Sequence, residues 1–204
     1  VSKTTTKGFL ELDKKVQSWF DENAPELSTK STGTSQVFSK ISSRDVPAML
    51  KGTGLALIGI SFIILLVIRN VKYGLMSLIP NLLPAAMAFG LWGYFTGSVT
   101  LAVSIVVAMT LGIVVDDSVH FMLKYAKARK EGKSPEDSVR QAFEKVGMAL
   151  TTTTIGLFLG FCVLAQSGFA VNKDMAQLTA ITVVFALVVD YLLLPPVLLS
   201  LIHI

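Results

Sequence analysis

Residues Gly112 to His120 read GIVVDDSVH, and they close an apolar run that begins near Val99 and carries no charge before Asp116. Carboxylates at membrane depth are costly to keep, so two adjacent ones indicate a functional site. On a helix, Asp116 and His120 lie one turn apart on one face, with Gly112 a turn earlier. Two carboxylates this close in poor solvent cannot both ionise easily, which suits a site that takes up and releases a proton.

The acids have a second interpretation, in which the membrane ends at Asp116 and both carboxylates face water. A helix of about 20 residues crosses a bilayer, and counting this length from Val99 places the pair within the last turn or two of the span. The sequence nevertheless continues in apolar character as SVHFML before Lys124. A span centred on this longer run holds both acids in its cytoplasmic half, and we favour this interpretation.

Composition places the chain among integral membrane proteins. It has 204 residues, 52% of them hydrophobic and 16% charged, against about a quarter charged in a soluble domain. The single Cys162 excludes an internal disulfide. Because the sequence has no metal-spaced His/Cys cluster, Walker loop or GxSxG motif, we expect no enzyme activity, no cofactor, no metal and no nucleic-acid partner. The chain opens at Val1 without a signal peptide, so we expect one piece of a longer polypeptide.

Two regions are predicted along the chain. Residues 1–48 are polar, with an amphipathic helix that ends near Pro25 and a further helix from Ser35 onward. Residues 49–204 hold five apolar segments of about the length that spans a bilayer. These spans cover about 50–69, 73–95, 98–124, 146–166 and 173–201, and Ser134-Pro135 begins an amphipathic helix of about 135–145 that we place along the cytoplasmic surface.

Basic residues orient these spans. Arg69 and Lys72 follow the first span, and seven Lys or Arg residues lie between Lys124 and Lys145, whereas the opposite loops hold almost none. Because basic loops stay in the cytoplasm, residues 1–50 are predicted outside and the C-terminus inside.

Other polar residues within the spans are candidate members of a proton relay. Thr151–Thr154 occupy a full turn, so one or two of them, with Thr152 and Thr153 favoured, should face the bundle interior; the alternative is that they bond only their own helix. Asp190 is a lone carboxylate in the last span, either a structural contact or a secondary relay group. His120 alone would more often be a packed histidine, but beside the acids it is a candidate relay partner.

Helix packing and bending have their own candidates. Pro80 and Pro84 share a helix face and should bend or loosen the second span, since each lacks a backbone donor. Gly156 and Gly160 form a GxxxG face suited to close helix packing, and Gly112 is a further small residue beside the acids.

Three motifs in this order resemble the C-terminal half of resistance-nodulation-division (RND) superfamily transporters. They are IPNLLP at 79–84, GIVVDDSVHF at 112–121 and LLLPP at 192–196, and the nearest likeness is to the MMPL-type branch, which includes hopanoid exporters and is related to Patched-like proteins. The resemblance implies an all-α membrane fold, with five helices of a six-helix half preceded by the tail of an extracytoplasmic α+β porter-like domain. It also implies a bacterial inner membrane location and an N-terminal half as partner.

In such transporters, acidic residues in the fourth span of each half carry the protons that drive export, and the matching residues here are Asp116 and Asp117. The second half of the drug-exporting branch usually has a lysine there, so this chain departs from it. The resemblance therefore implies export of lipids or other hydrophobic molecules rather than of drugs, with a homo-oligomer and periplasmic accessory proteins among the partners expected.

Two other functions share this layout. A Patched-like, sterol-sensing receptor module would have the fold without transport. An auxiliary subunit of protein translocation typically has an arginine near the start of the next span, and residues 146–154 contain none. Proton-driven lipid export is thus the function that the sequence favours.

Overall fold

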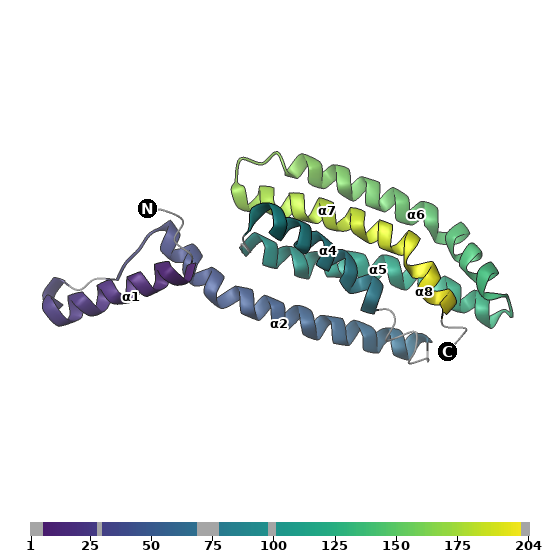
Figure 1. Ribbon diagram of the computed structural model, residues 1–204, viewed down its shortest axis with the longest axis horizontal. Coiled ribbons are helices and arrows are strands. Elements are labelled where there is room, and N and C mark those ends of the chain that lie inside the picture. The colour runs from purple at the N-terminus through teal and green to yellow at the C-terminus, as the bar shows by residue number, and fades with distance from the viewer. Residues whose placement is uncertain (1–5, 28–29, 69–77, 98–100, 201–204) are drawn as a thin grey trace. The chain divides into compact units, whose positions relative to one another are not determined.

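The computed structural model describes residues 6–27, 30–68, 78–97 and 101–200, which are helical with no strand among them (Figure 1). The all-α prediction is confirmed for these residues. The chain divides into two compact units, Val1–Leu50 and Lys51–Ile204. The described part of the first unit shows helices and no strand, so the α+β character that the resemblance implied stays a prediction.

The first unit is built on α1 (Thr6–Asn23), the short 3-10 helix η1 (Pro25–Leu27) and the beginning of α2 (Thr34–Ile68). The amphipathic helix predicted to end near Pro25 is confirmed. Its apolar side chains Leu12, Val16 and Trp19 are exposed, because the described part of this unit does not cover them.

One polar cluster connects α1 with the start of α2. The Asp13 carboxylate accepts hydrogen bonds from the Ser31 hydroxyl and from the Gln36 amide, which in turn donates to the Ser31 oxygen over 2.9 Å. The Ser31 bond is the largest cause that holds the pKa of Asp13 below its ordinary value of 3.8, and Gln36 and Lys40 act in the same direction.

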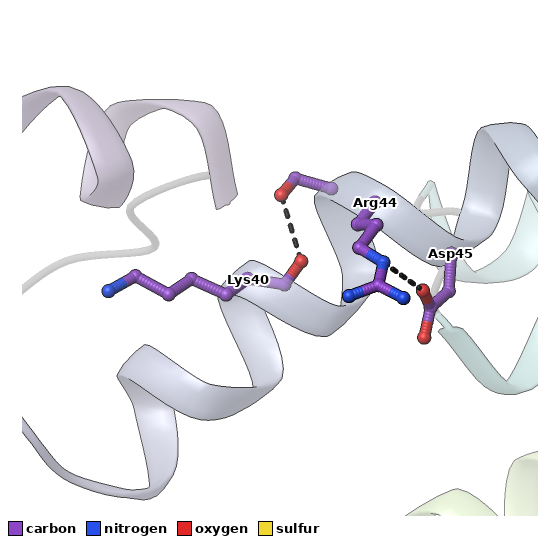
Figure 2. A network of polar contacts seen from close by, with 4 residues as sticks. Lys40, Arg44 and Asp45 are labelled. Atoms are coloured by element: carbon purple, nitrogen blue, oxygen red, sulfur yellow. Dashed lines mark hydrogen bonds and ion pairs between the residues drawn. The ribbon is translucent and has the colours of Figure 1, made fainter.

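Farther along α2 the charged groups are exposed. Arg44 Nε lies 3.6 Å from Asp45 Oδ1, and the Arg44 side chain is 90% exposed (Figure 2). Such a contact between neighbours in water contributes little to stability. Backbone hydrogen bonds, and not this ion pair, therefore stabilise this stretch of α2 as a helix.

The second unit is a bundle formed by α4 (Leu78–Thr96), α5 (Leu101–Lys130), α6 (Pro135–Leu164), α7 (Ala170–Leu192) and α8 (Leu194–Ser200). Helix α7 packs against α4, α5 and α6 and is the central helix of the bundle (Figure 1). Small residues such as Ala176, Ala180 and Ala186 on its buried stripe let these neighbours approach closely.

Two apolar clusters form the core. The first joins α5, α6 and α8 through side chains such as Phe121, Tyr125, Leu150 and Leu198. The second joins α4, α5 and α7 and consists of Ala88, Trp92, Val103, Val106 and Leu178. Along α5, Asp116 and Asp117 fall between the residues of the second cluster and those of the first.

Helix α6 differs from its prediction. The sequence suggested a surface helix of about 135–145 followed by a separate span, and the structure has one helix from Pro135 to Leu164. Its start is as predicted: the Ser134 hydroxyl accepts from the Asp137 N–H at 3.1 Å and donates to the Asp137 carboxylate at 2.8 Å. No proline follows Pro135 within the helix, so nothing interrupts the backbone at residue 145.

Three helical stretches among the described residues are long and apolar enough to cross a membrane: Val103–Lys130, Pro135–Leu164 and Ala170–Ser200. They correspond to the third, fourth and fifth predicted spans. The first two predicted spans both include residues within 69–77, which lie outside the described ranges, and the count of five stays a prediction.

The prolines act at different places. Pro80 lies in the first turn of α4 as described, where a missing backbone N–H removes no helical hydrogen bond, and Pro84 lies inside the helix. Pro84 therefore lies where it can bend the helix, and the effect predicted for Pro80 stays a prediction, because the residues before Leu78 lie outside the described ranges. Pro195 and Pro196 lie in the first turn of α8, where α7 has ended.

Candidate functional site

An open groove between α5 and α6 contains both predicted acids. Gly112, Ile113, Asp116 and Asp117 line it from α5, Thr153 and Leu157 line it from α6, and its volume is about 490 Å³. We call it the acidic groove. The helices α5 and α6 pack against each other, so the sequence motif and one of the four threonines come to face the same space.

The two acids differ in their surroundings. Asp116 is the outer one: its side chain is 73% exposed, and its Oδ1 lies 3.4 Å from Nε2 of His120, itself 57% exposed. Asp117 is half-buried. Consecutive helical residues point about 100° apart, which directs one acid outward and the other toward the bundle. The predicted Asp116–His120 proximity is confirmed.

Thr153 is the threonine placed opposite the acids. Its hydroxyl contacts the carbonyl oxygens of Ala149 and Leu150, each at 3.0 Å. These bonds use the hydroxyl proton within α6. The Thr153 oxygen can therefore still accept a hydrogen bond from a protonated group in the groove. Thr152, the other favoured residue, does not line the groove and bonds the Met148 carbonyl at 2.8 Å. Both favoured threonines are exposed, and the one that faces the bundle interior is Thr154, so this part of the prediction is wrong.

Asp190 of α7 is almost completely buried, at 2% exposure. The Ser118 hydroxyl of α5, buried as well, donates to Asp190 Oδ1 over 2.8 Å. Ser118 directly follows Asp117, so this bond fixes α5 to α7 beside the acidic groove. Sequence reasoning missed Ser118 as a site residue, although a hydroxyl next to two acids in an apolar run is a signal that could have found it.

The predicted glycine face is open. Gly156 and Gly160 are exposed, and no described atom would lie within 4 Å of a Cβ at either position. The close packing predicted for them is thus absent from the described residues. Gly112 likewise has open space beside it and lines the acidic groove instead of a helix contact.

Asn81, within the IPNLLP motif, is a further polar residue in the interior. It is 1% exposed, and its Oδ1 has no hydrogen-bond partner among the atoms described. Pro80 and Pro84 on either side of it are buried too. Over the described part of the chain, no three His, Cys, Asp or Glu side chains come together in a way that could hold a metal ion.

Comparison with known proteins gives two findings. The family model described as the MMPL family matches residues 12–202. A protein of Methanocaldococcus jannaschii, named only as a membrane protein, is 26% identical over 143 residues, which are 70% of this chain and 37% of that relative. The chain thus spans well under half the length of this relative. The match extends from α1 to α8 and contains the whole acidic groove, and on it the chain belongs to the MMPL family.

Proposed function

We propose that this chain is the C-terminal membrane half of a proton-driven RND-type exporter of lipids or other hydrophobic molecules. The observation that carries the proposal is the acidic groove, where two adjacent carboxylates in a membrane-spanning helix face a threonine of the next span. A carboxylate in such a place needs a reason to be kept, and proton transfer is the chemistry available to it.

The different surroundings of the two acids support a directional route. Asp116 and its partner His120 are reached from outside the bundle, whereas Asp117 lies farther in and next to Ser118. A proton would arrive at the Asp116–His120 pair and pass to Asp117, where neutralising the half-buried carboxylate removes an unfavourable charge from the bundle. The protonated and the ionised forms of Asp117 would then each favour a different packing of α5 in the bundle. These two packings are the two conformations between which a pump has to switch.

The available energy is sufficient for such a step. One proton moving through 100 mV releases about 2.3 kcal/mol, and each pH unit across the membrane adds about 1.4 kcal/mol. Together these give about 3.7 kcal/mol per proton, against the roughly 5.5 kcal/mol that moves a two-state equilibrium from 1:99 to 99:1, so one proton supplies most of such a switch and two protons exceed it. The proposal includes the orientation predicted from the basic residues, with the first unit outside and the α5–α6 connection in the cytoplasm.

The partners proposed are the bilayer, a hydrophobic or lipid substrate, and an N-terminal half of the same transporter. The side of the acidic groove that α5 and α6 leave open is a suitable place for contact with that half. A membrane location is consistent with the three candidate spans; a bacterial inner membrane, a homo-oligomer and periplasmic accessory proteins belong to the proposal alone.

The test uses the full-length protein in vesicles that contain a phospholipid with a fluorescent acyl chain. A pH gradient is imposed, and serum albumin outside the vesicles extracts labelled lipid that reaches the outer surface. We expect gradient-dependent extraction that a protonophore abolishes and that the double variant Asp116→Asn/Asp117→Asn lacks. Equal extraction by this variant and the wild type would show that the acids carry no coupled proton.

A further inference from the structure

Two adjacent residues at the end of α7 make polar contacts with two different helices. Asp190 accepts the 2.8 Å hydrogen bond from Ser118 of α5. The hydroxyl of the next residue, Tyr191, donates to the backbone carbonyl of Gly147 in α6 at 2.9 Å and lies 2.8 Å from the Thr151 hydroxyl. The chain therefore fixes α5 and α6 from one point on α7.

The aromatic rings around Tyr191 reinforce this point. Its ring centroid is 5.1 Å from that of Phe143 in α6, which in turn lies 4.7 Å from Phe121 of α5 in an edge-to-face arrangement. Helix α6 also approaches unusually closely here, because a Cβ at Gly147 would lie 3.2 Å from the Tyr191 hydroxyl. A glycine at residue 147 is what leaves room for the tyrosine oxygen to reach the carbonyl.

The contacts are placed next to both walls of the acidic groove. Ser118 directly follows Asp117 on one wall, and Thr151 lies two residues before Thr153 on the other. A shift of α7 at this point would therefore move the two walls relative to each other. Hydrogen bonds between membrane helices hold such a geometry because water does not compete for the groups.

We propose that Asp190 and Tyr191 form a joint, with Ser118, Gly147 and Thr151 as its partners, that sets the distance between Asp117 and Thr153 across the acidic groove. Both are positioning residues: neither lines the groove, and each acts through a neighbour of a residue that does. The effect of the joint on transport rests on the proposed function. The joint itself sets the spacing of helices, and this spacing can be measured without a transport assay.

Asp190 has a competing role as a proton carrier, and chemistry separates the two. A positioning residue needs only an oxygen that accepts the Ser118 bond, which asparagine also provides. A carrier needs an ionisable carboxyl group, which asparagine lacks. The pair Asp190→Asn and Asp190→Leu therefore distinguishes the roles, since both keep a side chain branched at Cγ and only the first keeps the acceptor.

The experiment measures the width of the groove directly. In the full-length protein with every native cysteine, Cys162 included, replaced by alanine, cysteines are introduced at Ile113 and Leu157, which line opposite walls, and their oxidative cross-linking rate is recorded. We expect Tyr191→Phe, Ser118→Ala and Asp190→Leu each to change this rate at least threefold and to lower lipid extraction at least fivefold. Asp190→Asn should restore the cross-linking rate and extract lipid several times faster than Asp190→Leu.

Two controls are matched to these changes. Ser104→Ala removes another buried α5 hydroxyl whose oxygen has no partner in the described residues, and Tyr94→Phe removes a hydroxyl from a tyrosine that is 85% exposed. Both should leave the cross-linking rate unchanged.

The outcomes separate the two proposals. Unchanged cross-linking in Tyr191→Phe and Ser118→Ala would overturn the joint. Wild-type cross-linking with no lipid extraction in Asp190→Asn would overturn it as well, by making Asp190 a carrier. Altered cross-linking in the joint variants, together with normal extraction by the double Asp116/Asp117 variant, would support the joint and reject proton coupling.

Discussion

At the scale of single residues, the adjacent acids are not equivalent. Asp116 is largely exposed and pairs with His120, whereas Asp117 is half-buried and precedes the serine that holds Asp190. The same helix geometry that brings both into the acidic groove thus gives them different partners. Their substitution should have unequal effects.

We expect Asp117→Asn to reduce lipid extraction at least a hundredfold, because it removes the inner carrier while keeping the side-chain shape. Asp116→Asn should reduce it about tenfold, and His120→Ala by less, because His120 acts only through Asp116. Initial extraction rates in vesicles with equal protein content measure this order. Glu144→Gln, an exposed change on α6 outside the groove, is the control, and a larger loss at His120 than at Asp117 would contradict the proposed route.

A second residue-scale prediction concerns Asp13. Because its pKa is lowered in the folded state, the contact of α1 with α2 is fully stabilised above the ordinary value of 3.8 and loses that contribution as the pH falls below it. Ser31→Ala, which removes the largest cause, should move the titration midpoint of Asp13 up toward 3.8. The carbon-13 shift of the Asp13 carboxyl group in the full-length protein in detergent measures both midpoints, and identical midpoints would disprove the assignment.

At the scale of elements, α6 makes three different kinds of contact along one continuous helix. Its first turn is capped by Ser134, its middle receives Tyr191 at Gly147, and Thr153 then faces the acids. A continuous helix keeps these three points in fixed register at about 1.5 Å per residue. A movement of α6 at the joint would therefore also move the wall of the acidic groove.

Two glycines of α6 provide a matched test of this arrangement. Gly156→Ala adds a methyl group in open space and should leave stability unchanged or raise it by up to about 1 kcal/mol, the usual advantage of alanine in a helix. Gly147→Ala has the same intrinsic advantage but brings a Cβ to 3.2 Å from the Tyr191 hydroxyl, so we expect lower stability. Thermal unfolding of the purified full-length protein compares them; equal melting temperatures would mean that Tyr191 moves aside freely.

At the scale of the whole molecule, the two units differ in where their apolar residues lie. The second unit has two apolar clusters, and along α5 the residues Asp117 and Ser118, the partner of Asp190, lie between those that join each cluster. The first unit keeps apolar residues such as Trp19 exposed, and the described part of this unit does not cover them. The orientation across the membrane is the prediction that belongs to this scale.

Single cysteines at Ser35 and Ser134, both exposed positions, report the orientation in a Cys162→Ala background. A membrane-impermeant thiol reagent added to intact cells should label the cysteine at Ser35 and not the one at Ser134, because the basic residues predict a cytoplasmic α5–α6 connection. Lysed cells, in which both cysteines should react, are the control. Labelling at Ser134 alone would reverse the topology.

Much of this organisation could be predicted from sequence because it depends on local patterns. The cap at Ser134, the end of α1 near Pro25 and the Asp116–His120 turn each involve residues within a few positions of one another. The pairing of Ser118 with Asp190 spans 72 residues, and that of Tyr191 with Gly147 spans 44. Contacts of this kind depend on how helices rotate and pack, which no local pattern specifies, and the choice of Thr153 over Thr152 depends on the same rotation.

The central position of α7 has a consequence for how the protein is made. The ribosome synthesises Ser118, Gly147 and Thr151 before Asp190 and Tyr191, so the residues that these two contact are made before α7 is complete. Until then α5 and α6 lack the contacts that α7 gives them, and helices without their native partners are open to wrong pairings. Synthesis of α7 is thus the step after which α5 and α6 can take the spacing that Asp190 and Tyr191 give them.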